Sequence, residues 1–186
     1  MELQPLIIID NPQDDSRTEK RVNVKLTFRR GEILYDCANC AFVEGDIADT
    51  QELEHARHQI QDIIADGNVD RVTRVLALAH AEAVEILFPF TNANVDGNDD
   101  LDDMKEQPDE YYVCLNLPAK FSKTTVNLLR HLIHEYLVCR ILQDWFSITY
   151  PSIADTWQAK VEEVKQKIKE AKAARTGFTK RNMTPF

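Results

Sequence analysis

The sequence is poor in the residues that tight turns and phosphate-binding loops require. Its 186 residues include five glycines and seven prolines, which disfavours both a glycine-rich nucleotide-binding loop and a turn-dense β-sandwich. No apolar run approaches the ~18 residues of a membrane span, and there are only four cysteines. A chain of this length does not need disulfides for stability. We therefore expect reduced thiols and a cytoplasmic protein that has no membrane partner.

Positive charge is also scarce. The sequence has 22 basic and 31 acidic residues, a formal net charge of −9. A surface that wraps nucleic acid or an anionic membrane needs a basic field, so we expect no sequence-specific nucleic-acid binding. Residues 1–10 have an acidic residue at position 2 and only four consecutive apolar residues. A secretory signal needs a basic start and a longer apolar run, and none is expected here.

What the sequence does contain is enough apolar material for a core, in two different periodicities. Residues 20–28 alternate between apolar and polar, which is typical of a half-buried strand. Residues 3–9 and 111–117 are the other candidate strands. Helical spacing predicts helices near 33–43, 50–65, 69–88, 123–146 and 153–175. The predicted fold is mainly α (α+β): a bundle of about five helices with a small antiparallel sheet of two or three strands, in one domain over 1–175.

The helix at 123–146 is apolar on nearly every side. Ten of its fifteen residues from Leu132 to Phe146 are apolar, and its polar residues fall on two almost opposite faces. Such a helix is buried on more than one side. It is therefore either the core helix or a helix shared between the core and an interface.

The helix at 153–175 has a much narrower apolar strip. Apolar residues recur at alternating spacings of three and four from Ala154 to Ala171, as in a coiled-coil seam. The strip either completes an antiparallel hairpin with the preceding helix or packs against another subunit. The candidate interface residues of the two helices are Trp145, Phe146, Trp157, Val161, Val164 and Ile168.

Charge is distributed unevenly between a loop and the C-terminal segment. Residues 96–110 contain eight acidic residues and one lysine, whereas residues 172–186 contain four basic residues and no acidic one. Opposite charges on two segments favour pairing between copies of the chain, although a solvated terminus is the alternative. We expect 176–186 to be an extended docking tail, with Phe178, Lys180, Arg181 and Phe186 as further interface candidates.

Three patterns suggest metal binding. Cys37 and Cys40 form a CxxC pair, but no second ligand pair follows, and two cysteines within a helix pack well in a core. Glu52 and His55 form one ExxH unit, whereas di-iron bundles use two. The loop from Asn92 resembles part of an EF-hand, with oxygen donors and a glycine at calcium-loop positions.

The alternative to each pattern is structural: packed thiols, solvated histidines and a solvated acidic loop. No serine–histidine–acid arrangement, P-loop or dinucleotide motif is visible. We therefore expect a non-enzymatic protein without a cofactor. If the loop from Asn92 binds an ion, calcium is the ion that its oxygen donors favour. The residues that a metal would use are Asn92, Asn94, Asp96, Asp100, Asp103, Glu52 and His55.

The last third of the chain resembles small helical neck proteins of tailed bacteriophages. The resemblance covers about residues 122–186: an aromatic-rich buried helix (HEYLVCRILQDWF), a proline turn, an alanine- and lysine-rich helix and a basic tail. It implies a structural, ring-type head–tail connector subunit of the virion that contacts copies of itself and other structural proteins. The alternatives are a metal-dependent helical-bundle enzyme using helix-borne histidine and glutamate, and an intracellular adaptor or regulatory binding protein.

Overall fold

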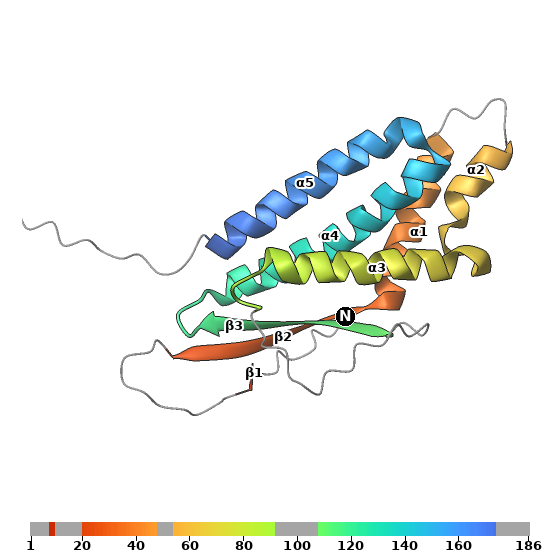
Figure 1. Ribbon diagram of the computed structural model, residues 1–186. Helices are drawn as coiled ribbons and strands as arrows, with labels where there is room; N and C mark the ends of the chain where they lie inside the picture. Colours follow the sequence, from red (N-terminus) through yellow and green to blue (C-terminus); the bar gives the residue numbers. More distant parts are fainter. Residues whose placement is uncertain (1–7, 10–19, 48–53, 92–107, 174–186) are drawn as a thin grey trace, which may run out of the picture.

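The computed structural model describes residues 8–9, 20–47, 54–91 and 108–173 (Figure 1). The prediction of a mainly helical protein with a small antiparallel sheet is confirmed. The elements are, in order, β1 (Ile8–Ile9), β2 (Arg21–Arg29), α1 (Arg30–Ile47), α2 (Glu54–Gln61), a 3₁₀ turn (Asp62–Ile64), α3 (Asp66–Ile86), β3 (Glu110–Pro118), α4 (Lys123–Thr149) and α5 (Pro151–Ala173).

The sheet has the order β1-β2-β3, and both pairings are antiparallel. β2 and β3 pair over their whole length, from Arg21 opposite Pro118 to Arg29 opposite Glu110. Both strands bury alternate side chains, as period-2 patterning requires. One face of the sheet therefore packs under the helices (Figure 1), through Val24, Leu26, Phe28, Tyr111, Val113, Leu115 and Leu117.

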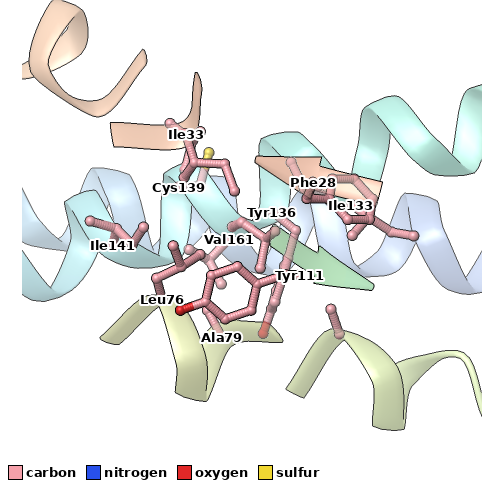
Figure 2. Close-up of a cluster of buried hydrophobic side chains, with 14 of the residues drawn as sticks. Phe28, Ile33, Leu76, Ala79, Tyr111, Ile133, Tyr136, Cys139, Ile141 and Val161 are labelled. Atoms are coloured by element: carbon pink, nitrogen blue, oxygen red, sulfur yellow. The ribbon is translucent and has the colours of Figure 1, made fainter. Parts of the chain in front are cut away.

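α4 is the central helix of the molecule. It lies between α3 and α5, and it also contacts α1 (Figure 1). Its buried residues occupy several sides of the helix, because each neighbouring element covers a different one. Figure 2 shows Ile133, Tyr136 and Ile141 of α4 among side chains from the sheet, α1, α3 and α5. The prediction that this helix is buried on more than one side is confirmed.

The boundary between the second and third helices differs from the prediction. The predicted helices near 50–65 and 69–88 leave Gly67 and Asn68 between them as the break. Instead the break is at Ala65, which is extended (φ −62°, ψ 147°), and α3 already begins at Asp66. No glycine of the described residues has a positive φ, so Gly67 does not form a left-handed helix end. The Nδ2 of Asn68 instead donates a hydrogen bond to the carbonyl oxygen of Asp62, in the preceding 3₁₀ turn, at 2.8 Å.

Buried side chains from β2, β3, the 3₁₀ turn and all five helices form one hydrophobic cluster. Within the part of the chain that the structure describes, no helix is both long and apolar enough to span a membrane.

Candidate protein-interaction surfaces

The six helix residues proposed for an interface lie in the core of a single chain, which corrects that expectation. Each is less than 9% exposed: Trp145, Phe146, Trp157, Val161, Val164 and Ile168. Their partners are intramolecular, because α5 packs along α4 as an antiparallel hairpin. Of the two alternatives for the narrow strip on α5, the structure therefore shows the hairpin.

The tryptophan region is closed by other elements of the same chain. The Nε1–H of Trp145 donates to the carbonyl oxygen of Ile60 in α2, at 2.9 Å. The Phe146 and Trp157 rings lie 5.5 Å apart between α4 and α5. The ammonium group of Lys160 lies 3.8 Å from the centre of the Trp157 ring. Elements of the same chain thus cover the two tryptophans, which are 6% and 5% exposed.

The remaining interface candidates and most metal candidates lie outside the described residues. These are Phe178, Lys180, Arg181 and Phe186 in the tail, Asn92, Asn94, Asp96, Asp100 and Asp103 in the loop, and Glu52. His55 lies in α2, where the backbone but not this side chain is described.

Among the described residues, one group of exposed large apolar side chains lies on α1. We call it the α1 outer face: Tyr35, Phe42, Val43 and Ile47, which are 66%, 54%, 54% and 71% exposed. The opposite side of α1 buries Ile33, Cys37, Ala41 and Gly45 against the bundle. α1 is thus buried on one side, and its exposed side carries these four large apolar residues among the polar residues Glu32, Asn39 and Asp46. Clustered exposed apolar side chains mark interaction sites far more often than single ones do.

Polar contacts hold the C-terminal half of this face in place. Gln61 of α2 packs on Gly45, where its side chain leaves no room for a Cβ atom. From there its Nε2 donates to the carbonyl oxygen of Phe42 at 3.3 Å. Arg57 of α2 forms an ion pair with Asp46. α2 therefore fixes the end of α1 without covering the outer face.

A second surface feature is a groove of about 640 Å³ between α3 and α5, with α4 as its floor. We call it the α3–α5 groove. Its apolar wall is formed by Leu78, Ala81, Ile86 and Val161, and its polar lining by Glu82, Glu85, Tyr136, Arg140, Gln143, Gln158, Glu162 and Lys165.

Glu82 organises the floor of the groove. Its Oε2 accepts a hydrogen bond from the Tyr136 hydroxyl at 2.8 Å and one from Nε of Arg140 at 3.3 Å. Burial and the bond to Glu82 raise the pKa of the Tyr136 phenol, so this hydroxyl remains a donor at neutral pH. Nη1 of Arg140 also donates to the side-chain oxygen of Gln143, at 2.8 Å. The floor is thus a fixed polar network.

One end of the groove is tied together by Lys172. From the last turn of α5 its ammonium group donates to the carbonyl oxygens of Ile86 and Phe88, at 2.6 and 2.8 Å. A cation there satisfies carbonyls that the end of α3 leaves unpaired. α3 and α5 consequently converge at their C-terminal ends and diverge toward their N-terminal ends (Figure 1).

The cysteines are packed rather than arranged around a centre. Cys37 and Cys139 are buried, Cys40 is partly buried, and Cys114 is exposed on β3. Burial is the main cause that raises the pKa of the Cys37 thiol, and burial together with the nearby Glu135 raises that of Cys139 to about 12. A thiol with a raised pKa is a weak nucleophile and a weak metal ligand at neutral pH.

The described histidine side chains lie on three different helices, α2, α3 and α4. His58 and His131 are exposed. His80 bonds through Nε2 to the Tyr112 carbonyl at 2.9 Å, and burial lowers its pKa. His134 contacts Asp36 at 2.7 Å, which joins α4 to α1. Across 20–47, 57–91 and 108–173 no three histidine, cysteine or acidic side chains are grouped to hold a metal ion.

No protein-family model, curated protein or solved structure matches this chain.

The α1 outer face is not among the predicted interfaces, although the sequence contains a pattern that indicates it. Apolar residues occur all around 33–47. Three of the four residues on the buried side, Cys37, Ala41 and Gly45, are small, so most of the large ones lie on the other side.

Proposed function

We propose that this protein is a non-enzymatic structural subunit that assembles with copies of itself and with other structural proteins. The observation that carries the proposal is the α1 outer face, where four large apolar side chains are more than half exposed on one helix. The resemblance of residues 122–186 to neck proteins of tailed bacteriophages favours a ring in a virion. In a ring, the face would contact a different surface of the next copy.

The energetics favour covering this face. Completely burying a large apolar side chain contributes about 1.5–3 kcal/mol, so the four partly exposed residues together offer several kcal/mol to an interface. A standard interface buries about 800 Å² per partner. Four side chains supply only part of that area, so a stable ring needs at least one further contact surface.

Replacing Phe42 with aspartate tests the proposal. We expect the dissociation constant for self-association to rise at least about tenfold, because the variant places a charge inside the interface and removes apolar area worth more than ~1.4 kcal/mol. Sedimentation equilibrium of the full chain gives the constant, and circular dichroism verifies the fold.

The matched control is Leu128→Asp. Leu128 is also a helical apolar residue, 49% exposed, but it lies on α4. Leu128→Asp is expected to leave the dissociation constant for self-association unchanged. A wild-type chain that stays monomeric at every concentration, or a Phe42→Asp variant that associates like the wild type, contradicts the proposal.

A further inference from the structure

We infer that the α3–α5 groove binds the C-terminal segment, residues 174–186, of a neighbouring copy. The inference rests on the proposed self-assembly and names its second contact surface, in addition to the α1 outer face.

The groove has the chemistry of a site for an extended peptide with basic and aromatic residues. Leu78, 52% exposed, forms an apolar wall with Ala81 and Ile86. On the α5 side of the groove, the amide of Gln158 can both donate to and accept from a peptide backbone. On the floor, the oxygen of Gln143 accepts from Arg140, and its NH₂ group is the donor that can face a peptide. The wall supplies apolar burial, and the amides supply the hydrogen bonds that a buried backbone requires.

Glu85 gives the groove its preference for a cation. Glu82 and Glu162 already pair with Arg140 and Lys165, at 3.3 and 3.4 Å. Among the described residues no cation pairs with the exposed carboxylate of Glu85. An incoming lysine or arginine at this rim gains a charge-assisted hydrogen bond without breaking an existing ion pair.

The sequence of residues 174–186 matches these requirements. It contains Arg175, Lys180 and Arg181 and no acidic side chain, together with Phe178 and Phe186. In an extended segment, Phe178 and Lys180 point to the same side because side chains alternate. One side of the segment can therefore place an aromatic ring on the apolar wall and an ammonium group toward Glu85.

The origin of the segment favours a neighbouring copy over the chain's own groove. Thirteen extended residues reach about 45 Å, which is long enough to fill the ~10 Å along α5 from Gln158 to Lys165. The segment follows Ala173, beside the end that Lys172 ties to α3. Its own groove would require it to reverse around that bridge, whereas a neighbour's segment can enter where α3 and α5 diverge (Figure 1).

Mixed-chain disulfide trapping tests this arrangement. Two differently tagged full-length chains carry Ala81→Cys and Thr176→Cys respectively, each with Cys40→Ser and Cys114→Ser to remove accessible thiols. Position 176 lies on the same side of an extended segment as Phe178 and Lys180. On mild oxidation of the mixture we expect a covalent pair that contains both tags. Ala159→Cys, at an exposed α5 position outside the groove lining, is the control and should not trap.

The inference is overturned if Ala159→Cys traps equally well. It is also overturned if trapping occurs only within one chain that carries both new cysteines, because the segment then occupies its own groove. An assembly that forms normally but gives no mixed-tag product contradicts it as well.

Charge reversal gives an independent measurement. Glu85→Lys should raise the dissociation constant for self-association about tenfold, as expected for loss of a charge-assisted bond. Combining it with Lys180→Glu and Arg181→Glu should restore most of the affinity. If Phe42→Asp weakens assembly but Glu85→Lys does not, this inference fails while the proposed function stands. If the wild-type chain never associates, both fail.

Discussion

Replacing Phe146 with alanine is expected to lower the free energy of unfolding by about 3–5 kcal/mol, the range found for large-to-small changes in a packed core. The side chain is 0% exposed and its ring lies 5.5 Å from that of Trp157. The cavity would lie between α4 and α5, in the hairpin that joins the two longest helices. Chemical denaturation, monitored by tryptophan fluorescence and circular dichroism, measures the loss.

The control is Leu128→Ala on the same helix. Leu128 is 49% exposed, so this substitution should cost less than about 1 kcal/mol. The loss at Phe146 should not depend on protein concentration, because its partners belong to the same chain. A loss that grows on dilution would show that Phe146 is buried by another copy instead.

The fold follows closely from the sequence where local periodicity and burial agree. Alternation from Val22 to Phe28 predicts β2, and the structure buries Val24, Leu26 and Phe28 on one face. The end of α3 follows from Pro89, which cannot continue a helix. The start of α3 does not follow from the sequence. Gly67 and Asn68 are compatible with a helix end or with the first turn of a helix, and tertiary packing decides between them.

The interaction surfaces are harder to predict, because one helix does not reveal how many neighbours cover it. The apolar circumference of α4 is compatible with burial by three elements of one chain or by fewer elements and a second copy. The structure shows the first arrangement, through α1, α3 and α5. The α1 outer face is also difficult to predict from the sequence, because the helix does not show which of its sides is buried. The small buried residues Ala41 and Gly45 weaken the contrast between its two sides, so Phe42 and Ile47 are easily assigned to the core.

The α3–α5 groove could not be predicted from the sequence. Its floor depends on Glu82 and Tyr136, which lie 54 positions apart and meet at 2.8 Å. Its convergent end depends on Lys172, which resembles the other lysines of a charged helix in the sequence. Only the register between α3, α4 and α5 makes this lysine a bridge.

Alkaline pH is expected to destabilise the fold through its buried thiols. Burial, and secondarily Glu135, raises the pKa of Cys139 from 9.0 to about 12. Between these two values the folded chain keeps a proton that the unfolded chain releases, so unfolding releases a proton and stability falls as pH rises. The slope approaches about 1.4 kcal/mol per pH unit, which gives a loss of about 2–3 kcal/mol at pH 11 for Cys139 alone.

Cys37 and Tyr136 change stability in the same direction, since burial is the main cause that raises the pKa of each. Urea denaturation from pH 7 to 11 under reducing conditions measures the total. Cys139→Ala should flatten the decline, because it removes one of the titrating groups. Cys114→Ala, at an exposed position on β3, should not. A wild-type stability that is constant up to pH 11 would show that Cys139 ionises as readily in the folded chain as in the unfolded one, and hence that the α1–α4 contact admits water.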